Sequence, residues 1–228
     1  MQQEFGVTPQ IGWNLMAYGH SATNARLYSD LGYKAQFFAK IDTEVKSDIS
    51  DPLNFLWQPS AKLGNSTQIL THIFHDKGIV PDGFQQDAAK PSDDPFDDNP
   101  KSSEYNAPDM SANFVNALLG LADKYPGVNN LIQVMGNQNY FENAQFNYMN
   151  MEKIMNYVSK NYKDLNMNIV FSTPSEYLAA LEAEKKEFPV FTGDLIQLAD
   201  ANIITNGYYS SKPDLKRAIK TASAESHV

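Results

Sequence analysis

Short apolar runs alternate with longer amphipathic stretches along this 228-residue chain, and this alternation constrains the fold more than any other feature. Gln10–Leu15 and Lys34–Ile41 have the lengths and compositions of buried strands. Between them, Ser21–Leu31 carries apolar side chains at helical spacing, with Ser21 as the expected N-cap and Gly32 at the stop. Strand, helix and strand in this order predict parallel strands joined by a crossover, and therefore an α/β fold.

The same alternation continues as far as Glu187. We expect short strands at Leu53–Pro59 and Gln68–Phe74, a helix at Ser111–Tyr125 capped by Ser111, a strand at Asn130–Met135, a helix at Glu142–Tyr162, a strand at Met167–Ser172 and a helix at Pro174–Glu187. Composition shows no linker that would divide the chain, so we expect a single domain over residues 1–228.

One segment breaks the pattern, because residues 78–108 are rich in Pro, Asp, Ser and Asn. Its sequence has too few apolar residues for a core element, so we predict a long acidic surface loop. An acidic run of this kind can also bind calcium. The spacing of a calcium-binding loop is missing, however, which favours a solvated loop.

Charge and composition exclude several classes of protein. The formal net charge is -9, and no run of Lys and Arg provides the basic surface that a nucleic acid needs. The chain has no cysteine, which excludes disulfides and thiolate metal sites. No apolar run approaches the roughly 20 residues of a membrane span, and we expect no signal peptide at the N-terminus. Asn65-Ser66-Thr67 fits the glycosylation sequon, although such triplets also arise by chance.

Several short motifs carry more specific information. Gly12–Ser21 reads GWNLMAYGHS, and four further motifs follow in the chain: FFAKID at Phe37–Asp42, MGNQNYFENA at Met135–Ala144, FSTP at Phe171–Pro174 and TNGYYSSKP at Thr205–Pro213. These stretches resemble, in the same order, motifs of glycoside hydrolase family 38, the α-mannosidases. The first resembles G-W-x-I-D-P-F-G-H-S of that family, and the resemblance covers most of the chain.

The resemblance implies an irregular, partial β/α-barrel-like α/β domain with mostly parallel strands and flanking helices. It also implies a zinc-dependent enzyme that hydrolyses α-linked mannose with retention of configuration. Retention needs two carboxyl groups roughly 5 Å apart. In this chain Met16 stands at the position of the family's nucleophile and Gln138 at that of its acid. Neither side chain can ionise, so both catalytic groups are lost.

The resemblance also implies a sugar pocket and a zinc site. Remnants of the pocket are expected at Trp13, Tyr18, Lys40, Thr205 and Tyr209, where Thr205 replaces an aromatic platform and Lys40 replaces an arginine. The family's other zinc ligands fall outside this chain as aligned, so no metal is expected.

Other ionisable residues offer weaker alternatives. Asp42, Glu142 and Asp194 lie inside matched motifs and could form a new catalytic pair, although turn and helix-start roles are favoured for them. His20, His72 and His75 are better explained as exposed or core histidines than as zinc ligands.

We therefore expect a catalytically inactive, truncated homologue with a glycan-binding or scaffold role. Two alternatives remain open: an active α-mannosidase fragment completed by other chain segments, and a structural subunit of a larger assembly. The expected partners are a mannose-type glycan and a protein or second copy at an exposed edge, with no nucleic acid and no membrane span. The resemblance suggests a lysosomal or secretory location.

Overall fold

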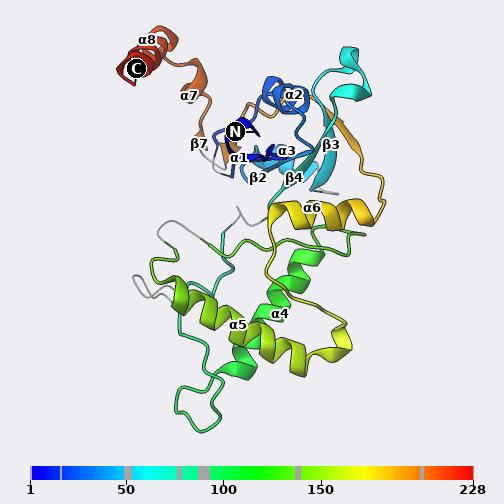
Figure 1. The fold of residues 1–228 in the computed structure, drawn as a ribbon, viewed down its shortest axis with the longest axis vertical. Coiled ribbons are helices and arrows are strands. Elements are labelled where there is room, and N and C mark those ends of the chain that lie inside the picture. Colours follow the sequence, from blue (N-terminus) through cyan, green and yellow to red (C-terminus); the bar gives the residue numbers. More distant parts are fainter. Residues whose placement is uncertain are drawn as a thin grey trace. The chain divides into compact units, whose positions relative to one another are not determined.

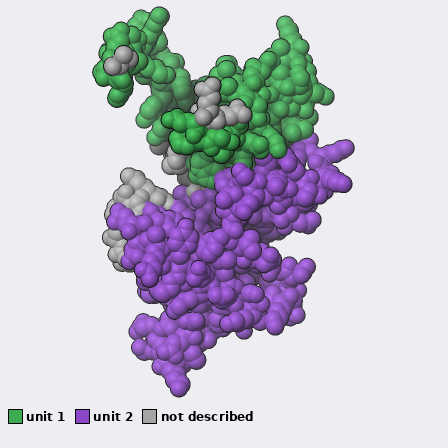
Figure 2. Space-filling view, viewed as in Figure 1, with its two compact units in different colours: residues 1–50, 55–73, 189–228 green, residues 51–54, 74–188 purple. Residues whose placement is uncertain are grey.

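The computed structural model of the chain describes residues 2–15, 17–48, 53–75, 79–86, 93–136, 140–200 and 203–227. The chain divides into two compact units, which Figure 2 shows in different colours. Unit 1 comprises residues 1–50, 55–73 and 189–228, and unit 2 comprises residues 51–54 and 74–188. Each unit has its own architecture, so each is described by itself.

Unit 1 is built on a five-stranded sheet. Its strands are β1 (Ile11–Trp13), β2 (Ala35–Phe38), β3 (Asn54–Gln58), β4 (Ile69–Ile73) and β5 (Val190–Thr192), in the spatial order β1-β2-β4-β3-β5 (Figure 1). The pairs β1–β2, β2–β4 and β3–β5 are parallel. This sheet, with helices beside it, confirms the predicted α/β class with mostly parallel strands.

The first strand-helix-strand unit forms as its sequence predicts. Helix α2 (Ala22–Asp30) connects β1 to β2, and the Ser21 Oγ caps it by accepting a hydrogen bond from the Thr23 N–H at 3.1 Å. Gly12 lies so close to the Tyr28 ring of α2 that an added Cβ would overlap it, so α2 packs directly on the strand. Every residue of β2 is buried, which explains why that strand has no polar-apolar alternation.

The remaining elements of unit 1 are short, apart from one helix. They are α1 (Gln2–Phe5), α3 (Thr43–Asp48), η1 (Ala61–Leu63), η2 (Asn65–Thr67), the antiparallel pair β6 (Ala199–Asp200) and β7 (Ile203–Ile204), α7 (Gly207–Ser210) and α8 (Pro213–Ser226). No residue of α8 is buried, although Leu215 and Ile219 are apolar.

Unit 2 is mainly helical. It contains α4 (Ala107–Ala122), α5 (Ala144–Asn161), η3 (Lys163–Leu165) and α6 (Pro174–Ala183), and α6 begins with a capping box between Thr173 and Glu176. Its core joins α4 and α5 to the segments between elements, and the buried members are Val80, Phe84, Phe96, Ala107, Phe114, Val115, Ile154 and Val158.

Three predictions for unit 2 are wrong. The predicted strands Asn130–Met135 and Met167–Ser172, which the structure describes in full, form no strand. The first of them makes isolated hydrogen bonds, such as Gln133 Nε2 to the Ile79 carbonyl, instead of a continuous ladder. Helix α4 also starts at Ala107, before the predicted cap, and Ser111 is fully buried within it.

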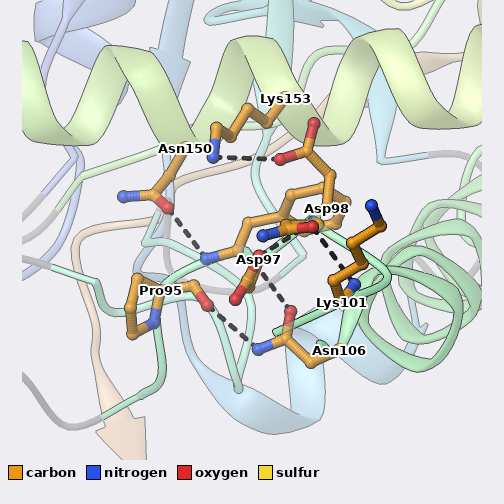
Figure 3. A network of polar contacts seen from close by, with 9 residues as sticks. Pro95, Asp97, Asp98, Lys101, Asn106, Asn150 and Lys153 are labelled. Atoms are coloured by element: carbon orange, nitrogen blue, oxygen red, sulfur yellow. Dashed lines mark hydrogen bonds and ion pairs between the residues drawn. The ribbon is translucent and has the colours of Figure 1, made fainter. Parts of the chain in front are cut away.

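The acidic segment 78–108 is fastened to unit 2 in its described parts, 79–86 and 93–106. Val80, Phe84 and Phe96 of this segment are buried in the core of unit 2. Figure 3 shows polar contacts that hold it. Asn150 of α5 accepts a hydrogen bond from the Phe96 N–H at 2.8 Å, and Lys153 forms a 3.1 Å ion pair with Asp98. The ion pair is largely exposed, so the buried rings contribute more to stability.

None of the helices within the described ranges combines the length and the apolar character that crossing a membrane requires.

Candidate functional site

The carboxyl ends of β1, β2 and β4 lie at one edge of the unit 1 sheet because these strands are parallel. Ligands of open α/β sheets bind at this edge. Trp13, Phe37 and His72 occupy one register row across the three strands. The ring centroids of Trp13 and Phe37 are 5.9 Å apart, and those of Phe37 and His72 are 5.2 Å apart. A continuous row of rings therefore crosses the sheet near the edge.

This row runs from the interior of the protein to its surface. Phe37 is 0% exposed and His72 is 1% exposed, whereas Trp13 is 45% exposed. The pKa of His72 falls to about 3 because burial removes the solvent that would stabilise its charged form. His72 is thus a neutral core residue, and Trp13 is the member of the row that a ligand can reach.

A second aromatic contact joins distant parts of unit 1. The rings of Tyr18 and Tyr208 are stacked, with centroids 4.4 Å apart and planes 5° from parallel. The Nζ of Lys40 lies 5.3 Å from the Tyr18 ring centroid, a cation–π arrangement. The Tyr209 hydroxyl donates to the Gly19 carbonyl at 3.4 Å. The structure therefore brings together Tyr18, Lys40 and Tyr209, which the sequence assigned to three separate motifs.

Tyr208 is a member of this group that sequence reasoning missed. The signal that could have found it is the adjacent tyrosine pair in TNGYYSSKP, of which the sequence analysis assigned only Tyr209 to the pocket. Lys216 supports the group by donating from Nζ to the carbonyls of Gly207 and Tyr208, at 2.8 and 2.7 Å. Lys216 thus adds a side-chain donor to carbonyls of the short helix α7, of which the Gly207 carbonyl also accepts from the Ser211 N–H at 3.0 Å.

The turn after β1 is tied to the segment 194–198. The His20 N–H donates to the Leu195 carbonyl at 2.7 Å, and the Leu195 N–H donates to the His20 carbonyl at 3.1 Å. Gly19 has a φ of +115° and lies against the backbone of Ile196, so an added Cβ would overlap the Ile196 carbonyl oxygen. Glycine is needed here both for backbone conformation and for close approach.

The His20 side chain is part of the packing of this turn. Its ring stacks on Phe38, with centroids 3.8 Å apart, and is 3% exposed. Burial lowers its pKa to about 4, while a hydrogen bond to the backbone of Lys40 opposes that effect. The Nε2 atom has no hydrogen-bond partner among the described residues. His20 is therefore a neutral imidazole with one ring nitrogen already engaged.

Asp42 and Asp194, two of the three acids considered for a new catalytic pair, both accept hydrogen bonds from backbone N–H groups in unit 1. Asp42 is buried, and its Oδ1 accepts from the N–H groups of Glu44 and Val45 at 3.0 and 3.2 Å, which caps α3. Its Oδ2 accepts from the Ala199 N–H at 3.0 Å. The Asp194 Oδ1 accepts from the Ile196 N–H at 2.8 Å. Glu142 is exposed and belongs to unit 2, so the structure does not bring the three acids together within one unit.

Three further positions complete the predicted set. Met16 and Gln138 lie outside the described residues. Thr205 is half-buried, and its Oγ1 donates to the Leu198 carbonyl at 3.1 Å. That hydroxyl fixes a turn and offers no aromatic face, unlike the platform that the resemblance places here.

The side chains in the described ranges that could ligate a metal do not fit a zinc ion. Structural and catalytic zinc sites need at least three His, Cys, Asp or Glu ligands within reach of one ion. Among the described residues, no group of three such side chains could hold a metal. Asp42 has both oxygens engaged, and His72 belongs to unit 1 while His75 belongs to unit 2.

The arrangement in unit 1 is suited to binding an uncharged ring. Trp13 and the stacked Tyr18–Tyr208 pair present apolar faces, and the Lys40 ammonium can donate hydrogen bonds to hydroxyl groups. We call these four residues the aromatic surface. The sheet defines the class as an α/β domain with mostly parallel strands, and the aromatic surface lies at its carboxyl edge, where open α/β sheets bind ligands.

Comparison with known proteins identifies the family. Residues 1–194 match the Glycosyl hydrolases family 38 N-terminal domain, and the chain belongs to that family. It is 30% identical over 229 residues to the lysosomal α-mannosidase of Dictyostelium discoideum, covering 99% of this chain and 22% of that protein. It is 33% identical over 229 residues to a probable α-mannosidase of Arabidopsis thaliana, covering 98% of this chain and 21% of that protein.

A solved structure supports the fold. An α-mannosidase from Enterococcus faecalis aligns with a TM-score of 0.57 at 14% identity, over 85% of this chain and 19% of that chain. At this identity the likeness concerns the fold alone. The chain thus spans about a fifth of the length of the relatives that it matches.

Proposed function

We propose that this domain binds mannosides without hydrolysing them. Met16 is the observation that carries this proposal, because it stands in the GWNLMAYGHS motif where the family has its aspartate nucleophile. A thioether has no proton to lose and cannot form the glycosyl ester through which a retaining mannosidase acts.

Two further features support the loss of hydrolysis. Gln138 occupies the position of the catalytic acid, and an amide has no proton to donate to a leaving oxygen. In unit 1, Asp42 already binds three backbone N–H groups and Asp194 binds one. Recruiting Asp42 as a catalytic group would break the cap of α3.

The aromatic surface supports the binding part of the proposal. A pyranose ring can lie on the exposed ring of Trp13, with its hydroxyls free to accept from a nearby donor such as the Lys40 ammonium. Because an aromatic platform is replaced by Thr205, we expect weak binding, with a dissociation constant on the order of millimolar for a monosaccharide.

Titration with methyl α-mannoside tests this proposal, with chemical-shift changes in the Trp13 indole as the readout. Trp57 is fully buried and serves as an internal control. We expect the Trp13 signal to shift and the Trp57 signal to stay, with no mannose released from an aryl α-mannoside. Tyr18→Ala should abolish the shift, whereas Tyr33→Phe, outside the aromatic surface, should keep it. An unchanged Trp13 signal at saturating sugar would contradict binding.

We also propose that the chain holds no zinc of its own. The support is that Asp42, His20 and His72 of unit 1 are engaged in capping and packing. Elemental analysis of the purified chain after dialysis against zinc checks this. Stoichiometric zinc would contradict the proposal.

An active α-mannosidase completed by other chain segments is the second candidate. It is favoured by one observation, namely that the relatives are about five times as long as this chain.

A structural role in an assembly is a third candidate. We propose self-association through exposed apolar side chains such as Leu215 and Ile219 of α8, and light scattering that finds a monodisperse monomer would contradict it.

The location is proposed from the relatives. The Dictyostelium and human proteins are both named lysosomal α-mannosidases, and the human protein is 28% identical over 218 residues. We therefore propose that this chain resides in the lysosome or the secretory pathway. Cell fractionation against a lysosomal marker tests this location.

A further inference from the structure

Asn65-Ser66-Thr67 is the single Asn-x-Ser/Thr triplet in the sequence, although asparagine is abundant throughout the chain. The middle residue is not proline, so the triplet is a competent N-glycosylation sequence. It forms the short helix η2 in the connection between β3 and β4. Asn65 and Ser66 are both exposed, as a glycan-bearing turn must be.

The side-chain geometry leaves the acceptor nitrogen available. The Asn65 Oδ1 accepts from the Gln68 Nε2 at 3.4 Å, and no hydrogen bond involves Nδ2 among the described residues. Attachment of a sugar to Nδ2 keeps the carbonyl oxygen and one N–H. The long Oδ1 contact therefore survives modification, and folding loses no bond.

Thr67 has a structural task in the same turn. It is 3% exposed, and its Oγ1 donates to the Gly64 carbonyl at 3.2 Å. This bond alone could account for a threonine at position 67. It does not account for an exposed asparagine two residues earlier, whose weak contact could be made by many polar side chains.

The place of the turn in the sheet allows a bulky modification. Because β4 is parallel to β1 and β2, its amino end lies with theirs, at the edge opposite to the aromatic surface. Helix η2 ends at Thr67, directly before β4 begins at Ile69. In Figure 1 this connection is the cyan segment beyond the end of β3. A glycan here leaves the carboxyl edge of these strands open.

We propose that Asn65 is an N-linked glycosylation site. In the reaction, the Asn65 Nδ2 forms a bond to the anomeric carbon of an oligosaccharide carried on a lipid diphosphate. The bond between that carbon and the phosphate oxygen breaks, Nδ2 loses one proton, and the lipid diphosphate leaves. The proposal rests on the luminal location proposed above, but not on the loss of hydrolysis.

The test is expression of the full chain in eukaryotic cells, with and without an added secretory leader, followed by intact mass spectrometry. With the leader, we expect an oligosaccharide mass that a peptide-N-glycosidase removes, leaving aspartate at position 65. Asn65→Gln should lack this mass. Thr67→Ser keeps a hydroxyl and the sequon and should retain it, while Thr67→Ala should lose it.

The outcomes separate the proposed glycosylation site from the proposed luminal location. A luminal wild-type chain without added mass would overturn the glycosylation site, and so would added mass that persists in Asn65→Gln. If the chain with a leader is glycosylated but the native chain in its own cells is found unmodified in the cytosol, Asn65 is a competent acceptor and the luminal location is wrong.

Discussion

Gly19 and Ile196 meet so closely that the backbone carbonyl of Ile196 fills the space where a side chain at position 19 would begin. This contact joins the turn after the first strand to a segment almost at the other end of the chain. The paired hydrogen bonds between His20 and Leu195 lie directly beside it. The end of the Gly12–Ser21 motif is thus held against residues 195 and 196, and this close approach requires glycine at position 19.

Gly19→Ala should destabilise unit 1 by about 3 kcal/mol, because it combines a steric overlap with a strained φ of +115°. Urea unfolding followed by tryptophan fluorescence measures this, since Trp13 and Trp57 both lie in unit 1. Gly32→Ala is the control. Its φ of +81° is also positive but nothing surrounds it, so a loss of about 1 kcal/mol is expected. Equal losses in the two variants would contradict the role of Ile196.

Asp42→Ala should destabilise unit 1 by about 2 kcal/mol, because it removes the cap of α3 and leaves the Ala199 N–H without its acceptor. Asp42→Asn should cost less, since one amide oxygen can still accept. Urea unfolding followed by tryptophan fluorescence measures the stability of both variants. A stable Asp42→Ala variant that had lost an activity would show that Asp42 serves chemistry instead of structure.

Unit 1 should lose stability as the pH falls from 6.5 toward 4. Burial lowers the pKa of His20 from 6.5 to about 4 and that of His72 from 6.5 to about 3. Both bind protons more readily when unfolded, so their contribution is fully present above pH 6.5 and is lost on acidification. Between pH 7 and pH 5 the two together remove at most about 4 kcal/mol.

Unfolding midpoints in urea at several pH values measure that loss. His20→Gln should remove about one of the two protons taken up on unfolding. The slope of the unfolding free energy against pH should therefore be roughly halved. A pH-independent midpoint between 7 and 5 in the wild type would show that these rings are not buried as described.

Glu184→Gln should weaken unit 2 at neutral pH by about 1 kcal/mol, because this carboxylate binds the N–H groups of Asn129 and Asn130. Burial raises the pKa of Glu184, but the hydrogen bonds from Asn130 and Asn129 outweigh burial and lower it below 4.5. The stabilisation is therefore present above pH 4.5 and is lost as the pH falls through the lowered pKa.

Circular dichroism at helical wavelengths follows this unit, which contains α4, α5 and α6. The difference between wild type and Glu184→Gln should shrink at acidic pH. A difference that stays constant across pH would show that charge has no part in the contact.

Sequence reasoning predicted the strands at the start of unit 1 better than the segments of unit 2 that it took for strands, for a physical reason. The strand Lys34–Ile41 and the helix after Ser21 are defined by local signals, namely burial pattern, an N-cap and a stop glycine. Asn130–Met135 has an equally apolar pattern but finds no partner strand, and pairing is a tertiary property that periodicity does not record.

The candidate site was predictable only in part. The motifs indicated Tyr18, Lys40 and Tyr209, because each lies in a recognisable stretch. Their proximity, and the stack of Tyr18 on Tyr208, depend on the return of the chain to the first strand after about 190 residues. Nothing in the local sequence encodes that contact.

The most direct test of the central claim is intact mass spectrometry after incubation with a fluorinated mannosyl fluoride, which traps the glycosyl ester of retaining mannosidases. The incubation includes zinc, and an active family 38 α-mannosidase serves as the positive control. We predict that this chain gains no mannosyl adduct while the control is labelled, because Met16 offers no carboxylate. A stoichiometric adduct on an aspartate or glutamate of the wild-type chain would contradict the account and identify the nucleophile.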